Sequence, residues 1–174
     1  VNFLTMEKPI ILQKILIMKS AYIFIFLAII TLNSCSQTVD ILEVESRDGI
    51  TYLKKSNKPF KGTVISWYSP GNKFSVSEYD KGLLNGKQTT YYANGQVQSI
   101  ITYLDFYMNG PYVFYYKNGH IKEKGNFIHC MEDGLWSYFY ENGEKKEEGS
   151  FNNGIRSGNW LFYDENGRSK SKHY

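Results

Sequence analysis

The hydrophobic and polar residues divide this chain into two parts with different patterns. One continuous apolar run extends from Ala21 to Ile30. After residue 35 the chain instead carries short segments rich in aromatic and β-branched residues, separated by glycines. Such segments are typical of β-strands, and none of this later part has the apolar period of an amphipathic helix. The pattern therefore predicts an all-β fold that follows a short apolar N-terminal segment.

Ten of the 15 glycines recur with a fixed period of 24 residues. The first series comprises Gly62, Gly86, Gly110, Gly134 and Gly158. The second series, nine residues later in each case, comprises Gly71, Gly95, Gly119, Gly143 and Gly167. A fixed period of this size is the signature of a repeat architecture. We therefore predict five repeats, which start at residues 62, 86, 110, 134 and 158.

Both glycine series predict reversals of the chain. Asn precedes the second-series glycine in four of the five repeats, as in Asn94-Gly95. Asn-Gly is a strong hairpin signal, because type I′ turns need positive φ at both central residues. The first series has similar pairs, such as Asn85-Gly86. We therefore expect two reversals in each repeat, one at each glycine.

The segments between these glycines predict the strands. First strands are expected at residues 63–68, 87–92, 111–116, 135–140 and 159–163. Second strands, which are more polar, are expected at residues 73–79, 97–103, 121–127 and 145–151. One hairpin cannot bury a face alone, whereas stacked hairpins can share an aromatic seam. The predicted fold is an elongated, largely single-layer antiparallel meander of β-hairpin repeats.

The repeat pattern, G-x-W/Y-x-x-Y/F-x-x-N-G, resembles the MORN repeat. Its best copies are residues 134–143 (GLWSYFYENG) and 158–167 (GNWLFYDENG). The resemblance spans roughly residues 48–172. It looks closest to the bacterial variant labelled as a YwqK-like antitoxin of toxin–antitoxin systems. The resemblance implies the hairpin fold and suggests an antitoxin role, although repeat scaffolds host many different functions.

Residues 18–34 have the features of a secretory signal peptide. Met18 and Lys19 provide a short basic start ahead of the apolar run. That run is shorter than the roughly 20 apolar residues that a transmembrane helix needs. Because Met18 is a better start, we interpret residues 1–17 as an over-extended beginning of the chain. An uncleaved membrane anchor and plain secretion are the alternative interpretations.

The signal segment ends in Leu32-Asn33-Ser34-Cys35, which resembles the bacterial lipobox. The resemblance implies cleavage before Cys35 and a lipid attached to its thiol. Ser36 stands where an Asp would signal retention in the inner membrane, so the resemblance implies an outer-membrane lipoprotein. Residues 35–48 are then a lipidated cysteine and a tether, or alternatively contain a first edge strand. The repeat domain is expected over residues 49–174.

Composition and charge exclude several functions. The residues after 34 keep 17 of the 20 basic and 16 of the 17 acidic side chains, which is no electrostatic footprint for nucleic acid. The sequence contains no P-loop, no G-x-S-x-G and no H-E-x-x-H motif. His129 and Cys130 are adjacent, and adjacent residues on an extended chain point in opposite directions. We therefore expect no enzyme, cofactor or metal site, while a Cys35–Cys130 disulfide stays open as an alternative.

The aromatic seam has two interpretations that differ in function. Its members either form the core of the sheet or present an exposed strip to a protein, a glycan or a lipid headgroup. The candidate binding residues are Trp136, Tyr138, Tyr140, Trp160 and Phe162. Together with the lipobox, they predict a lipid-anchored envelope module that binds or scaffolds a partner, with protein favoured. The alternatives are a glycan-binding protein and an immunity-like antitoxin, which would need a toxin that acts in the envelope or is secreted.

Overall fold

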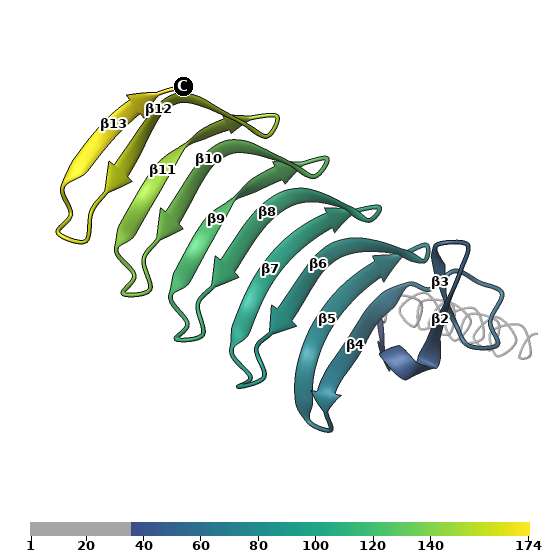
Figure 1. Ribbon diagram of the computed structural model, residues 1–174. Coiled ribbons are helices and arrows are strands. Elements are labelled where there is room, and N and C mark those ends of the chain that lie inside the picture. The colour runs from purple at the N-terminus through teal and green to yellow at the C-terminus, as the bar shows by residue number, and fades with distance from the viewer. Residues whose placement is uncertain (1–35) are drawn as a thin grey trace, which may run out of the picture. The chain divides into compact units, whose positions relative to one another are not determined.

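Eleven strands lie side by side in one open sheet in the computed structural model, which describes residues 36–174 (Figure 1). The predicted signal peptide and Cys35 lie outside the described residues. The strands of the sheet, in spatial order, are β1 (Gln37–Asp40), β4 (Gly62–Ser69), β5 (Asn72–Asp80), β6 (Leu83–Tyr91), β7 (Val97–Leu104), β8 (Tyr107–Tyr115), β9 (Ile121–Ile128), β10 (Met131–Phe139), β11 (Lys145–Asn152), β12 (Ile155–Tyr163) and β13 (Ser169–His173). From β4 onward each strand pairs antiparallel with the next, which confirms the predicted all-β meander of hairpin repeats.

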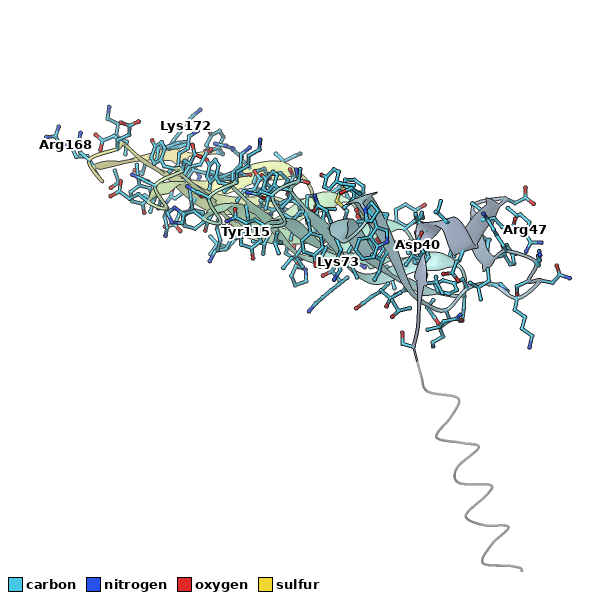
Figure 2. All side chains as sticks on the ribbon, turned by 90° about the horizontal axis from the view of Figure 1, so that it is seen from below. Asp40, Arg47, Lys73, Tyr115, Arg168 and Lys172 are labelled. Atoms are coloured by element: carbon cyan, nitrogen blue, oxygen red, sulfur yellow. The ribbon has the colours of Figure 1, made fainter. Side chains whose placement is uncertain are left out.

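Side chains project from both sides of this layer (Figure 2), and beyond the N-terminal segment that packs against β1 and β4 no second layer of described residues covers either side. In the part of the chain that the structure describes, no helix has the length and apolar character needed to cross a bilayer.

The Asn-Gly loops connect the strands along one side of the sheet, where the second glycine series predicted reversals. This side, formed by the ends of the strands, is called a long edge of the sheet. In the loop after β6, Gly95 N donates to Tyr92 O and Tyr92 N donates to Gln96 O, both at 2.8 Å. Among these residues only Gly95 has positive φ, at 85°, and Asn94 Oδ1 accepts from Gln96 N at 3.1 Å. The reversals are confirmed. Their type differs, because this is the longer loop that ends on one left-handed residue rather than a type I′ turn.

The opposite long edge carries two-residue turns, and here the prediction was wrong by four residues. Both residues of each turn have positive φ, which is the type I′ geometry. The turns are Lys81-Gly82, Asp105-Phe106, His129-Cys130 and Asn153-Gly154. Phe106 and Cys130 hold the left-handed position that glycine favours, so no glycine marks those two turns in the sequence. The first strand of each later repeat therefore begins four residues earlier than expected.

The first glycine series lies at or inside the strands, and from Gly86 onward each of these glycines lies where the strand pairing shifts register. Across Gly86 the pairing moves from Tyr79–Leu84 to Ser77–Gln88. Glu78 lies between these pairs, and its carboxylate accepts a hydrogen bond from Lys87 N at 2.7 Å. A Cβ atom at Gly86 would overlap that carboxylate. The glycine is thus required by the bulge that bends the strand, and not by a turn.

Two further sets of hydrogen bonds join each repeat to its neighbour. Along the edge with the two-residue turns, the second turn residue donates its N–H to a carbonyl of the preceding repeat at 2.7–2.9 Å: Gly82 to Phe60, Phe106 to Leu84, Cys130 to Met108 and Gly154 to Glu132. Along the edge with the Asn-Gly loops, a tyrosine hydroxyl donates to a carbonyl of the following repeat at 2.6–3.0 Å: Tyr68 to Tyr91, Tyr92 to Tyr115, Tyr116 to Phe139 and Tyr140 to Tyr163. The repeats are therefore bound together at both ends of their strands.

The N-terminal residues of the described chain cap the first repeat. β1 pairs in parallel with β4, and its Val39 is buried with Phe60 and Val64. The short 3-10 helix η1 (Ile41–Glu43) and the hairpin of β2 (Val44–Arg47) and β3 (Ile50–Leu53) follow. The tether expected over residues 35–48 is therefore wrong from Gln37 onward, because apolar Val39 is drawn into the core. The alternative of a first edge strand is what the structure shows.

Replacement of Cys130 by glycine tests the strain in the two-residue turns. Cys130 has φ of 66°, and a left-handed residue with a Cβ costs about 1–2 kcal/mol, partly offset by the higher unfolded-state entropy of glycine. Cys130 Sγ also accepts a hydrogen bond from Met108 N at 3.2 Å, so the reference is Cys130→Ala, which lacks this contact and keeps the Cβ. Relative to Cys130→Ala, we expect Cys130→Gly to raise the free energy of unfolding by about 0.5 kcal/mol in urea titrations. Gly154→Ala is the matched opposite change at the equivalent turn position, and it should destabilise by about 1 kcal/mol. A Cys130→Gly protein less stable than Cys130→Ala would contradict the assignment of strain.

Candidate functional site

Trp136 lies at the centre of an aromatic cluster on one face of the C-terminal half of the sheet. Its indole Nε1 donates to Asn126 O at 3.2 Å, so the ring lies across the neighbouring strand β9. There it covers Gly125, where a Cβ atom would overlap the ring. Four rings surround it, with centroid distances of 5.1–6.1 Å: Tyr112, Phe127, Tyr138 and Phe151. The indole is 2% exposed, which is core packing inside a single-layer sheet.

Trp160 repeats this arrangement one repeat later. Its Nε1 donates to Ser150 O at 3.1 Å, and its ring covers Gly149 of β11. The guanidinium of Arg156 lies 3.8 Å from the ring centroid and also pairs with Glu147 at 2.8 Å. Trp160 is 0% exposed, because the arginine and neighbouring rings cover the side that the sheet does not.

The five residues proposed as a binding surface do not form one exposed strip. Trp136 and Trp160 are buried, and Tyr138 and Phe162 are half-buried beside them. Tyr140 lies at the edge with the Asn-Gly loops, and its hydroxyl is held by a carbonyl of the next repeat. The core interpretation of the aromatic seam therefore fits the structure, and its two Trp rings are closed to a partner.

The phenols of this face are held in the neutral form. Burial, together with the nearby Glu123 and Glu147 carboxylates, raises the pKa of Tyr138 to about 12. Burial also raises the pKa of Tyr112, whose hydroxyl donates to Glu123 Oε1 at 2.8 Å. Neither tyrosine is poised to act as a base near neutral pH. Both hydroxyl groups serve the packing of the aromatic face.

The titratable groups elsewhere do not converge on a reaction site. Within residues 36–174, no three His, Cys, Asp or Glu side chains come together as metal ligands. His129 and Cys130 are exposed in their two-residue turn, and Cys35 lies outside the described residues. Glu147 and Glu148 are adjacent carboxylates, but Lys145 Nζ lies 2.7 Å from the Glu148 carboxylate and holds the pKa of Glu148 below its usual value. The absence of catalytic groups stays a prediction for the whole chain.

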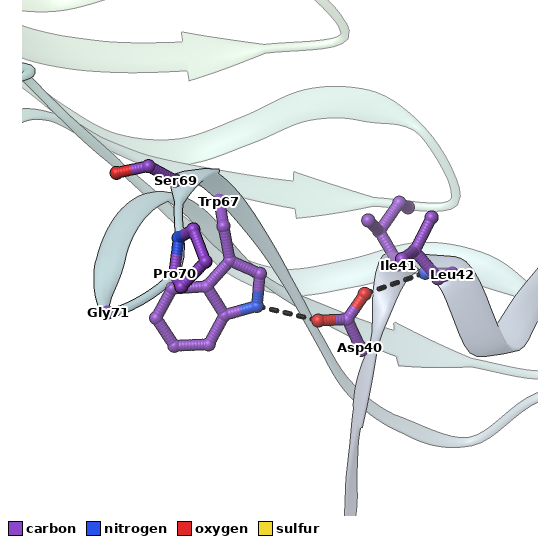
Figure 3. A pocket seen from close by; sticks show the side chains of 7 residues that line it. All are labelled: Asp40, Ile41, Leu42, Trp67, Ser69, Pro70 and Gly71. Atoms are coloured by element: carbon purple, nitrogen blue, oxygen red, sulfur yellow. Dashed lines mark hydrogen bonds between the residues drawn. The ribbon is translucent and has the colours of Figure 1, made fainter.

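A hollow of about 510 Å³ lies at the N-terminal end of the sheet, between η1 and the β4–β5 hairpin (Figure 3). Trp67 Nε1 donates to Asp40 Oδ2 at 2.7 Å, and Asp40 Oδ1 accepts from Leu42 N at 2.8 Å. Both carboxylate oxygens are therefore engaged. The hollow presents the apolar edges of Trp67, Ile41 and Leu42 rather than a free charge.

Exposed apolar side chains gather along the edge that carries the two-residue turns. Cross-strand pairing places Leu104 opposite Tyr107 and Ile128 opposite Met131, so the partners of each pair share a face. Ile155 holds the same position after the next turn. These five residues, which are 40–72% exposed, are called the turn-edge stripe here. The sequence interpretation missed the stripe because it placed these reversals at the first glycine series, four residues too late.

The comparison with known families matches the hairpin units directly. A family described as "MORN repeat variant" matches residues 84–105, 108–129 and 132–153. The chain carries MORN repeat variants. Each matched unit runs from the beginning of one strand, through an Asn-Gly loop, to the first residue of the next two-residue turn. The MORN repeat of this chain is therefore one hairpin, and the two-residue turns join consecutive MORN repeats.

Two solved structures contain chains with local similarity. One is the "Glycosylation Associate Protein (Gap123) complex from Streptococcus agalactiae", with 14% identity over 64% of this chain and 20% of that chain, at a TM-score of 0.35. The other is a GtfA/B complex bound to UDP and GlcNAc, with 9% identity over 75% of this chain and 23% of that chain, at a TM-score of 0.26. This chain thus spans only 20% and 23% of their lengths. No curated protein matches it.

Substitution of Gly149 tests the packing of Trp160. An alanine Cβ would overlap the buried indole, and overpacking of this kind costs about 1–3 kcal/mol. We expect Gly149→Ala to lower the free energy of unfolding by at least about 2 kcal/mol in a denaturant titration. Ser150→Ala is the control, because its side chain points to the opposite face, and it should change stability by under about 0.5 kcal/mol. Equal effects of the two substitutions would refute the packing.

The raised pKa of Tyr138 predicts a loss of stability in alkali. Because the pKa in the folded state lies above the ordinary value of 10.0, this contribution is complete below pH 10 and is lost as the pH rises toward 12. Tyr138→Phe should therefore lose less unfolding free energy between pH 10 and pH 12 than the wild type. Tyr107→Phe removes a hydroxyl from a residue that is 59% exposed, and it should keep the wild-type slope. Identical slopes for all three proteins would exclude the effect.

Proposed function

We propose that this chain is a lipid-anchored envelope protein whose MORN repeat sheet binds a protein partner along the turn-edge stripe. The observation that carries the proposal is the stripe itself, five apolar side chains that stay 40–72% exposed along one edge. Monomeric soluble proteins rarely expose a contiguous apolar patch larger than a few hundred Å², and larger patches mark contact sites. The buried Trp residues account for stability and leave this edge for recognition.

The chemistry of the stripe favours protein over glycan or nucleic acid. Its members are aliphatic apart from Tyr107, and they offer few groups that could hydrogen-bond to sugar hydroxyls. Tyr and Met, the types found at Tyr107 and Met131, are enriched in the cores of protein interfaces. The near balance of acidic and basic residues after residue 34 argues against a phosphate backbone as ligand.

The anchor rests on the sequence Leu32-Asn33-Ser34-Cys35 and the apolar run before it. Only Ser36 separates Cys35 from β1, so a lipid on Cys35 would hold the sheet at the membrane surface. Two or more acyl chains give stable attachment. An exported protein cannot meet a cytosolic toxin, and an antitoxin role would therefore need a toxin in the envelope.

Photo-crosslinking in living cells tests the binding edge. A photoreactive amino acid at Tyr107 or Ile155 should yield a crosslinked protein partner. The same group at Lys117, which is exposed at the opposite long edge, should not. Equal crosslinking at both edges, or none at the stripe, would reject the proposed surface. A crosslinked partner that kills cells when this gene alone is deleted would identify an immunity-like role.

Metabolic labelling tests the anchor independently. An alkyne fatty acid should label the wild-type protein, and Cys35→Ala should abolish both the label and membrane fractionation. Cys130→Ala is the matched control for the loss of one cysteine, and it should keep the label. An unlabelled wild-type protein in the soluble fraction would reject the anchor.

A further inference from the structure

We propose that the partner segment which occupies the turn-edge stripe is a basic amphipathic α-helix. The inference rests on the proposed protein-binding function, and it names the shape and charge of the bound segment. It draws on the spacing of the stripe, on a hollow beside the stripe and on the charges at its rim.

The spacing of the stripe matches a helix better than an extended segment. Its residues lie on β7, β8, β9, β10 and β12, and neighbouring strands are about 4.8 Å apart. The apolar positions of a heptad recur every 3.5 residues on average, which is about 5.3 Å along a helix axis. Side chains on one face of an extended segment recur about every 6.8 Å. Over the stripe's length of about 24 Å a helix drifts out of step by about 2.5 Å, whereas an extended segment drifts by about 10 Å, so the helix is the better match.

A hollow on β8, β9 and β10, farther from the turns than the stripe residues of these strands, offers a place for one long anchoring side chain. It measures about 350 Å³, and its apolar walls are Pro111, Val113 and Leu135. Leu135 is 64% exposed, so the hollow opens to solvent. Lys124 also lines the hollow, and its ammonium group lies 5.7 Å from the centroid of the Phe139 ring. An apolar side chain from a helix on the stripe fits this place.

Acidic side chains lie beside the middle of the stripe. Asp105, in a two-residue turn, and Asp133, on the same face as Met131, are the carboxylates of residues 104–109 and 128–135 that lie on the side of the stripe, and these two segments contain no Lys or Arg. Asp105 is exposed and Asp133 is half-buried. An apolar strip with carboxylates at its margin complements a helix that has an apolar face and basic flanks.

The chain itself covers the first two-residue turn and so sets the end of the free surface. Thr51 N donates to Gly82 O at 2.9 Å, and Gly82 N donates to Phe60 O at 2.7 Å. Gly82 is buried under this cover, whereas the equivalent Phe106 is 43% exposed. In the part of the chain that the structure describes, no segment covers the later turns in this way. The free stripe therefore begins at β7, and its length matches a helix of about 16 residues.

Binding of three synthetic peptides to the full chain in phosphatidylcholine nanodiscs tests the inference. The first is an 18-residue helix with Leu at heptad positions a and d and with Lys and Gln elsewhere. The second replaces each Lys by Glu, and the third has the composition of the first with Leu and Lys in alternation. Fluorescence anisotropy, corrected with empty nanodiscs, should show at least about tenfold tighter binding of the first peptide than of the others.

Variants of the protein separate the apolar and the acidic contributions. Ile128→Ser with Met131→Ser should weaken binding of the basic helix at least about tenfold, since each side chain loses apolar burial. Asp105→Asn with Asp133→Asn should weaken binding severalfold and reduce its dependence on salt. Glu141→Gln with Glu165→Gln removes two exposed charges from the opposite edge, and this control should bind as the wild type does. Circular dichroism confirms that each variant is folded.

Equal binding of the acidic or the alternating peptide, or unchanged binding by the stripe variant, would overturn the inference. A cellular crosslink at Tyr107 without binding of the basic helix would also overturn it and leave the proposed function intact. Absence of the crosslink would reject both.

Discussion

Every hairpin of this sheet depends on the hairpins beside it, because a two-stranded ribbon has no second layer on which to bury its side chains. The chain meets this constraint by making contacts between neighbouring repeats at three places. Backbone N–H groups of the two-residue turns bind one long edge, and tyrosine hydroxyls bind the other. Between these edges, large side chains such as Trp136 and Trp160 lie over small residues of the preceding strand. The 24-residue period keeps all three contacts in register at once.

The contact between side chains in the middle of neighbouring strands recurs at equivalent positions along the array, but its chemistry changes. Near the N-terminus Gln88 Nε2 donates to Ser77 Oγ at 3.0 Å, which is a hydrogen bond between two polar side chains. Two repeats later Trp136 covers Gly125, and the indole takes the space that the missing side chain leaves. A larger residue on one strand is thus matched by a smaller one on its neighbour. This matching explains why the C-terminal half buries two Trp residues without a second layer.

The same packing determines which surface is free for a partner. The most conspicuous aromatic residues, Trp136 and Trp160, are buried and pack neighbouring strands together. The side chains beside the two-residue turns lie at the ends of the strands, where the chain reverses. Among the described residues, no neighbouring strand extends past them to cover them. Apolar residues at those ends therefore stay in solvent, and the proposed binding function follows from this edge rather than from the aromatic face.

The sequence by itself determined the repeat, the all-β class and the Asn-Gly loops, because these depend on local backbone preferences that recur every 24 residues. It did not locate the two-residue turns, since Phe106 and Cys130 adopt left-handed conformations that are imposed by pairing and by hydrogen bonds to the preceding repeat. The burial of Trp160 likewise depends on Gly149, which packing of β12 on β11 brings beneath its ring. The tertiary structure decided these features, because they arise from contacts across strands and not from the order of neighbouring residues.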